Sequence, residues 1–207
     1  MSAPQTAIEP VDVPVRSPRL RQLLDAALHV IADDGLRGLT HRAVDRRAGL
    51  PEGSCSAYLR TRQALQAALT EYVADGLLAD VDRLAERIRA CGVNDDDEGV
   101  RAALDLFLHW LDQRELLVAR LELTMAATRD ADLAAILADH RARLIGLVAG
   151  IMAATGKEHS TARAEALVAS YDGILLAALL KPAAERAAFL TRSLELLSSG
   201  LAGAPEE

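Results

Sequence analysis

The fold is decided by residues 39–65, which read LTHRAVDRRAGLPEGSCSAYLRTRQAL. Thr40 can cap a short helix over His41–Arg47, and Gly49 then breaks the chain sharply. Pro51 opens a second, very short helix. Helices below about 12 residues are marginal in water, so these two must be held by packing against each other. Two short helices joined by a tight turn that contains glycine are typical of a helix-turn-helix.

The regions on either side of this motif also predict helices. Ser17 and Pro18 open a first helix, and Gly35 ends it after about Asp34. Half of the 207 residues are apolar, chiefly Ala and Leu, while only 3% are aromatic, a composition that favours helix over strand. The remaining helices are expected over about 51–59, 61–90, 98–112, 115–128, 130–155, 160–180 and 183–199. The sequence therefore predicts an all-α fold of about nine helices.

The same pattern predicts how the chain divides. Residues 1–16 hold three prolines and no apolar periodicity, so we expect a flexible arm there. A three-helix helix-turn-helix domain is expected over 17–65 and a larger helical domain over 66–202, followed by a short tail over 203–207.

Charge is distributed unevenly along the chain. The formal net charge is −7, yet the segment from Arg16 to Arg62 holds nine arginines and only five acids, an excess of four positive charges. The rest of the chain therefore carries −11. This asymmetry predicts an end that faces DNA phosphates and an acidic remainder that limits non-specific binding.

Other motifs limit the compartment and the chemistry. Cys55 and Cys91 cannot form a disulfide framework, and neither has a zinc-ligand spacing, so we expect no metal and no cofactor. The longest uncharged run, residues 144–156, is shorter than the roughly 18 apolar residues of a membrane span. With no signal stretch in the sequence, we expect a cytoplasmic protein.

Residues 39–65 closely resemble the DNA-binding motif of the TetR family of bacterial transcriptional regulators. Three positions depart from the pattern of many relatives: Ser56 replaces a tyrosine, Leu59 a phenylalanine and Arg62 a lysine. Residues 120–133 resemble the family's regulatory domains more weakly. The matching positions are Thr40, Ala43, Ala48, Gly49, Leu50, Gly53, Ser54, Leu59, Arg62 and Leu65. The resemblance implies a homodimer formed by the last two long helices and a larger domain, residues 66–202, that binds an effector.

A recognition helix presents short polar side chains to base edges while its flanks hold phosphates. Thr40 is either a phosphate ligand or only a helix cap, and Tyr58 either contacts the DNA backbone or is core. Cys55 is expected as a small buried residue and not as a redox sensor. The predicted DNA-binding residues are Thr40, His41, Arg42, Pro51, Glu52, Ser54, Ser56, Ala57, Tyr58, Arg60 and Arg62.

The larger domain offers an apolar lining with a few polar groups, as ligand pockets do, although each such residue can equally be ordinary core. The pocket candidates are Phe107, Trp110, Leu121, Glu122, Met125, His140, Leu144 and Tyr171. The last helices are too apolar to be exposed, so pairing with a second copy is expected. The dimer candidates are Leu167, Ile174, Ala178, Phe189, Ser193, Leu196 and Leu197.

These features predict a DNA-binding regulator, expected to be a repressor that a small molecule releases from a palindromic operator. The chain shows no nucleophile elbow, P-loop, HExxH or dinucleotide fingerprint, so we do not expect an enzyme. The alternative is a helical interaction protein that keeps the scaffold without specific DNA binding. The net acidity and the missing tyrosine at Ser56 favour that alternative.

Overall fold

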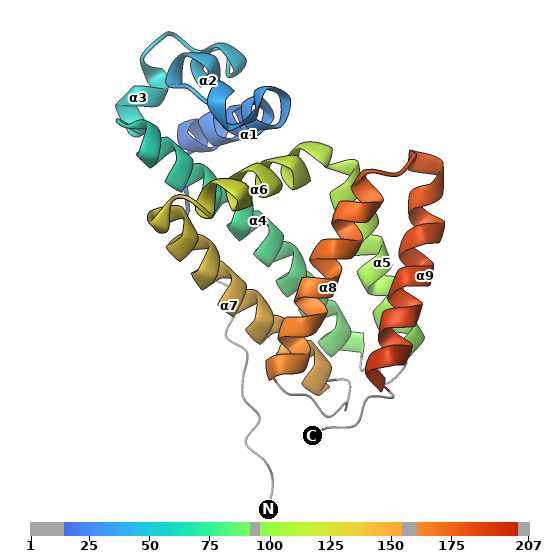
Figure 1. The fold of residues 1–207 in the computed structure, drawn as a ribbon. Helices are drawn as coiled ribbons and strands as arrows, with labels where there is room; N and C mark the ends of the chain where they lie inside the picture. The colour runs from blue at the N-terminus through green and yellow to red at the C-terminus, as the bar shows by residue number, and fades with distance from the viewer. Residues whose placement is uncertain (1–14, 92–95, 155–160, 203–207) are drawn as a thin grey trace, which may run out of the picture. The chain divides into compact units, whose positions relative to one another are not determined.

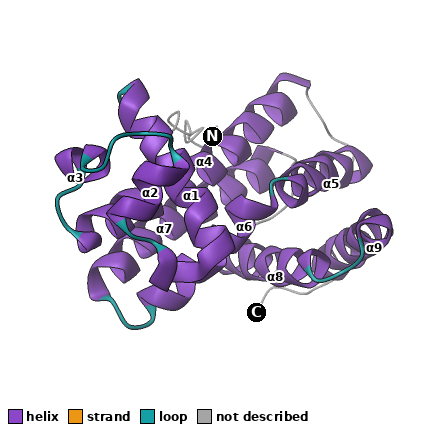
Figure 2. Ribbon diagram, turned by 90° about the horizontal axis from the view of Figure 1, so that it is seen from above, coloured by secondary structure: helices purple, strands orange, loops and turns teal. Residues whose placement is uncertain are grey.

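The computed structural model describes residues 15–91, 96–154 and 161–202, and within these ranges it contains nine helices and no strand (Figures 1 and 2). The all-α prediction is therefore confirmed. Most of the predicted arm and the whole predicted tail lie outside the described residues. The helices are α1 (Pro18–Gly38), α2 (His41–Arg47), α3 (Ser54–Tyr58), α4 (Arg62–Cys91), α5 (Asp96–Asp112), α6 (Arg114–Ala127), α7 (Ala131–Ala154), α8 (Thr161–Leu179) and α9 (Ala183–Ala202).

The chain forms two compact units. One comprises residues 13–77 with 109–142 and is called the amino-terminal unit below. The described parts of residues 78–108 and 143–207 belong to the carboxy-terminal unit. The amino-terminal unit contains residues of both sequence domains expected above. The described residues of the carboxy-terminal unit all belong to the expected domain of 66–202. The division at residue 65 stays a prediction.

In the amino-terminal unit, α1 is the central helix. Ser17 caps it by accepting a hydrogen bond from the Leu20 N–H at 3.2 Å, and Pro18 occupies the first turn, as the sequence predicts. One face of α1 is fully buried, including Leu23, Leu24 and Ile31. Because α1 packs against both α2 and α6, this apolar face forms the base on which the short helices rest.

A break in α1 lies at Gly35, one residue beyond the predicted end of the helix. Its φ of 67° is in the region that favours glycine, whereas its ψ of −177° is extended, so the chain kinks there and resumes helical turns to Gly38. The carboxylate of Glu122 on α6 accepts a hydrogen bond from the Leu36 N–H at 3.2 Å, directly after the kink. This contact ties the end of α1 to α6.

In the carboxy-terminal unit, α8 and α9 pack along each other, and both views show them side by side (Figures 1 and 2). Arg186 of α9 donates to the Leu179 carbonyl at 3.4 Å and so helps to satisfy the end of α8, and it also donates to the Lys181 carbonyl in the turn at 3.2 Å. A separate apolar cluster joins Val148 of α7 to Ala164 and Val168 of α8. None of the described helices is both long and apolar enough to cross a membrane.

Candidate nucleic-acid interface

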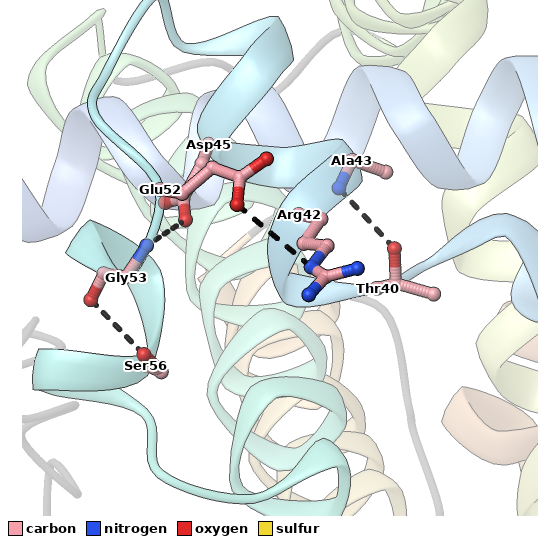
Figure 3. A network of polar contacts seen from close by, with 7 residues as sticks. All are labelled: Thr40, Arg42, Ala43, Asp45, Glu52, Gly53 and Ser56. Carbon is pink, nitrogen blue, oxygen red and sulfur yellow. Dashed lines mark hydrogen bonds and ion pairs between the residues drawn. The ribbon is translucent and has the colours of Figure 1, made fainter.

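Helix α2 begins as the sequence predicts. The Thr40 Oγ1 accepts a hydrogen bond from the Ala43 N–H at 3.2 Å, which satisfies one of the free N–H groups of the first turn (Figure 3). The helix ends at the turn of Gly49, whose φ is 67°. Thr40 is thus a helix cap, and its predicted contact with phosphate is a further role that the cap does not preclude.

Helix α3 is shorter than the sequence predicts and starts at Ser54 instead of Pro51. The reason is Gly53, which precedes α3 with a φ of 94°, a conformation outside the helical range. The Ser54 hydroxyl donates to the Pro51 carbonyl at 2.7 Å, and the Ser56 hydroxyl donates to the Gly53 carbonyl at 3.0 Å. Both hydroxyl protons are therefore used within the chain, which leaves the oxygens to accept from DNA.

Two predicted DNA contacts also have partners inside the chain. A ring nitrogen of His41, Nε2, lies 2.6 Å from the Leu59 carbonyl and donates a hydrogen bond to it, because a carbonyl can only accept. Arg62 at the start of α4 donates to the Leu36 carbonyl at 2.6 Å. These bonds connect the ends of α1, α2, α3 and α4, so His41 and Arg62 have structural roles whether or not they also contact DNA.

The remaining candidates are exposed. Arg42 and Glu52 form an ion pair at 4.0 Å, with 82% and 80% of their side chains exposed (Figure 3). Tyr58 is 49% exposed, so it is not a core residue. Pro51, Ala57 and Arg60 are exposed as well. Among the predicted DNA contacts, Arg42, Arg60, the ring of Tyr58 and the carboxylate of Glu52 therefore face solvent, and Arg46 and Arg47 of α2 are exposed beside them.

Cys55 of α3 is fully buried, as the sequence predicts for a small residue that joins the two short helices. Burial, and after it the charge of Asp45, raises the pKa of the Cys55 thiol to about 11. At neutral pH the thiol is therefore protonated and a poor nucleophile, which argues against a role in redox sensing.

Asp45 is the residue of this site that the sequence reasoning missed. It lies on α2, is only 1% exposed, and accepts a hydrogen bond from the Gly53 N–H at 2.8 Å (Figure 3). It also accepts from the Cys55 N–H at 2.7 Å. A signal was present in the sequence, because Asp45 follows Val44 and precedes Ala48 by three positions on the inward side of the helix. A carboxylate there needs N–H partners, and the start of α3 supplies them.

The pocket candidates fall in both units. In the carboxy-terminal unit, Phe107 and Tyr171 meet edge to face with ring centroids 5.1 Å apart, and burial raises the pKa of Tyr171 to about 12. Leu144 packs against the cluster around Val148. In the amino-terminal unit, Trp110 is buried, Leu121 is half-buried and Met125 is 57% exposed.

The two polar pocket candidates have partners in the amino-terminal unit. Glu122 accepts from the Leu36 N–H, as described above. The His140 Nε2 lies 3.6 Å from one oxygen of Asp75, whose other oxygen accepts from Arg16 at 2.7 Å. Both side chains thus contact other helices of this unit, while the buried Nδ1 of His140 has no hydrogen-bond partner among the described residues.

The dimer candidates differ in exposure. Leu196 is 68% exposed, while Ala178 has no exposed surface in the single chain and Leu167 packs against the cluster around Val148. Ile174, Phe189, Ser193 and Leu197 are half-buried. Two further leucines of this region are exposed and were missed by the sequence reasoning, namely Leu176 at 43% and Leu180 at 80%.

Comparison with known proteins supports this reading of the fold. Residues 94–198, just over half of the chain, match the family model described as "Tetracyclin repressor-like, C-terminal domain". No curated protein matches the chain.

Three solved structures illustrate the likeness. A TetR family member from Streptomyces coelicolor is 27% identical, with a TM-score of 0.63 over 86% of this chain and 98% of that one. The multidrug binding protein EbrR, complexed with ethidium, is 26% identical, with a TM-score of 0.61 over 88% of this chain and 99% of that one. A transcriptional regulator from Rhodococcus sp. RHA1, at 21% identity, shares the fold with a TM-score of 0.74 over 91% of this chain and 100% of that one.

The family match covers residues 94–198, and α2 and α3 form a helix-turn-helix in the part of the sequence that precedes it. Members of this family regulate transcription and are not enzymes. The chain belongs to the TetR family of transcriptional regulators.

Proposed function

We propose that the chain is a repressor that binds a two-fold symmetric operator as a homodimer and leaves it when a small effector binds. The observation that carries this proposal is the exposed surface of the helix-turn-helix. Arg42 and Arg60 are exposed there, close in sequence to a recognition helix that displays Ala57 and Tyr58. Arginines hold phosphates, while short side chains and an aromatic ring suit base edges and the DNA backbone.

The homodimer is proposed on exposed leucines of the α8–α9 hairpin, one in the turn after α8 and one on α9. Leu180 and Leu196 are 80% and 68% exposed in the single chain, although isolated surface leucines are not unusual. Leu180 directly follows α8 and Leu196 lies on α9, and their position in the hairpin of the two helices expected to pair supports an interface with a second copy. A two-fold dimer carries two recognition helices and therefore fits a palindromic operator.

The effector is proposed to be a flat aromatic cation. The similar protein EbrR is described as a multidrug binding protein and is known in complexes with ethidium, proflavin and malachite green. In the present chain, Phe107 and Tyr171 form an aromatic pair in the carboxy-terminal unit. The charge of −11 outside residues 16–62 favours a cation over an anion.

A mobility-shift titration tests DNA binding, using the DNA that flanks the chain's own gene. We expect the wild-type protein to shift this fragment at low salt and to lose affinity as salt rises. Arg60→Ala should weaken binding to all sequences, whereas Arg87→Ala, an exposed arginine of α4 outside the helix-turn-helix and the proposed dimer helices, is the matched control. Absence of any shift at low salt would instead support the interaction protein that keeps the scaffold.

Thermal unfolding with malachite green tests the effector proposal. The assay omits DNA because flat cations also bind nucleic acid. A ligand present at about 100 times its dissociation constant stabilises a protein by about 2.7 kcal/mol, so the melting temperature should rise with dye concentration. An unchanged melting temperature up to the solubility limit of the dye would reject this effector class while leaving DNA binding untouched.

A further inference from the structure

Two side chains of α2 hold the two ends of α3. Asp45 accepts from the Gly53 and Cys55 N–H groups at 2.8 and 2.7 Å, and His41 donates to the Leu59 carbonyl at 2.6 Å. We propose that His41 and Asp45 form a clamp that positions the recognition helix for DNA, a role that rests on the proposed function. Both are positioning residues in this proposal, because each acts on DNA through α3.

The chemistry of the clamp matches the polarity of a helix. The first turn of a helix leaves N–H groups without partners and the last turn leaves carbonyl groups without partners. Asp45 offers an acceptor at the first end of α3, and His41 offers a donor at the other end. Residues four positions apart lie on the same face of a helix, so α2 can present both groups to α3 at once.

Helix α3 has little else to fix it. It is only five residues long, far below the length at which a helix is stable alone. Gly53 stands at its N-cap and has no side chain to accept a hydrogen bond. The hydroxyl groups of Ser54 and Ser56 donate to carbonyls, so neither caps the free N–H groups. The clamp therefore gives side-chain partners to both ends of α3, in addition to the burial of Cys55.

Because Asp45 is buried, its role in positioning α3 can be distinguished from direct contact with DNA. Only 1% of Asp45 is exposed, so its carboxylate cannot reach a base or a phosphate. A buried carboxylate is tolerated here because two N–H groups donate charge-assisted hydrogen bonds to it. Any effect of Asp45 on DNA binding must therefore pass through α3, which carries the exposed Ala57 and Tyr58.

The experiment uses the full chain with Cys91→Ser, so that Cys55 is the single thiol. Asp45→Asn keeps the size of the side chain but places an amide donor against one of the two N–H groups. His41→Phe keeps a ring and removes the donor. Asp33→Asn is the control, because it removes one negative charge from an exposed pair with Arg47. Three quantities are measured for each variant: affinity for the promoter fragment, the rate of Cys55 alkylation, and helicity with melting temperature.

We expect Asp45→Asn to remain folded, to bind the promoter fragment at least about tenfold more weakly, and to expose Cys55 to alkylation well below the melting temperature. His41→Phe should change both quantities in the same direction. Binding to an unrelated fragment should change little, because the arginines that hold phosphates are intact. Asp33→Asn should behave like the parent protein in all three measurements.

Two outcomes would overturn the clamp. If Asp45→Asn is folded and leaves both the promoter affinity and the protection of Cys55 unchanged, Asp45 does not position α3. If His41→Phe weakens binding while Cys55 stays protected, His41 contacts DNA directly and is not part of a clamp. If the parent protein binds no DNA, the proposed function fails, and the alkylation rates still decide whether the two side chains hold α3.

Discussion

The reading segment, residues 40–60, and the hairpin of α8 and α9 are built in opposite ways. Helices α2 and α3 have seven and five residues, and polar side chains bonded to backbone groups hold them in place. Helices α8 and α9 have 19 and 20 residues, rich in alanine and leucine, and they pack along each other. In the first region single residues have defined geometric roles. In the second, the apolar pattern predicts a helix but does not show which of its faces packs within the chain and which meets a second copy.

The largest expected effect is on the hairpin. Replacing both Leu180 and Leu196 by Glu should convert the proposed homodimer into a monomer, because each leucine buried at an interface contributes about 1.5–3 kcal/mol. The dissociation constant of the dimer should rise at least about 100-fold. Sedimentation velocity measures this change directly. Since both side chains are exposed in the single chain, the monomer should remain folded.

The control for this change is Met125→Glu, which places the same charge at an exposed apolar position of α6. It should leave the dimer intact and so distinguish an interface from a general effect of added charge. A double leucine variant that still sediments as a dimer would show that α8 and α9 pair through other residues or not at all. In that case the exposed leucines of the hairpin would have no role in forming the dimer.

The next largest effect is a change in stability on replacing glycine by alanine, with opposite signs expected in the reading segment and in α7. Gly49 has a φ of 67°, and a Cβ there would meet no other atom within 4 Å, so Gly49→Ala should cost only the backbone strain, about 1 kcal/mol. Gly146 lies inside α7, where a Cβ also has free space. Gly146→Ala should therefore stabilise the protein by about 0.4–1 kcal/mol. Urea unfolding of both variants tests the opposite signs.

The same contrast explains what could be predicted from the sequence. The cap at Thr40 and the positive φ of Gly49 and Gly35 could be recognised because a cap or a positive φ requires particular residue types, although Gly35 kinks α1 where the sequence predicts its end. The sequence predicts the start of α3 at Pro51, three residues early, because proline often opens a helix, whereas the positive φ of Gly53 delays the helix to Ser54. Local signals thus identified the turns of the reading segment to within a few residues.

Side-chain partners across helices could not be predicted in this way. The pattern placed Glu122 and His140 among apolar residues, but it could not show that Leu36 and Asp75 lie opposite them. For the same reason Ala178 and Leu196 had equal standing as dimer candidates, although one is buried within the chain and the other exposed. Helical periodicity defines a face of each helix, and only the packing decides what that face meets.

A smaller effect concerns pH. The pKa of the Cys55 thiol is raised by burial from an ordinary value of 9.0 to about 11, so above pH 9.0 the unfolded chain loses this proton before the folded chain does. The contribution of Cys55 to stability is thus fully present below pH 9.0 and is lost as the pH rises toward 11. The free energy of unfolding in a Cys91→Ser background should stay level up to about pH 9 and fall between pH 9 and 10.

Cys55→Ala in the same background should remove this part of the fall in the free energy of unfolding with pH. The window ends at pH 10 because burial also raises the pKa values of Tyr72 and Tyr171 from 10.0 to about 12, and these groups add the same trend at higher pH. Equal slopes for the two proteins below pH 10 would show that the Cys55 thiol is not shielded within the folded reading segment.

The smallest effect on overall affinity is expected at Glu52. An exposed carboxylate is unfavourable beside phosphates, but in the major groove it can accept from the N4 amino group of cytosine. Glu52→Ala should therefore leave affinity nearly unchanged while relaxing the preference at one base pair, typically worth about 1–3 kcal/mol. Selection of bound sequences from a random pool, with Arg60→Ala as the control for phosphate contact, measures the preference. Unchanged selected sequences would mean that Glu52 only orients Arg42, and the base readout of the reading segment would then rest on the arginine and on α3.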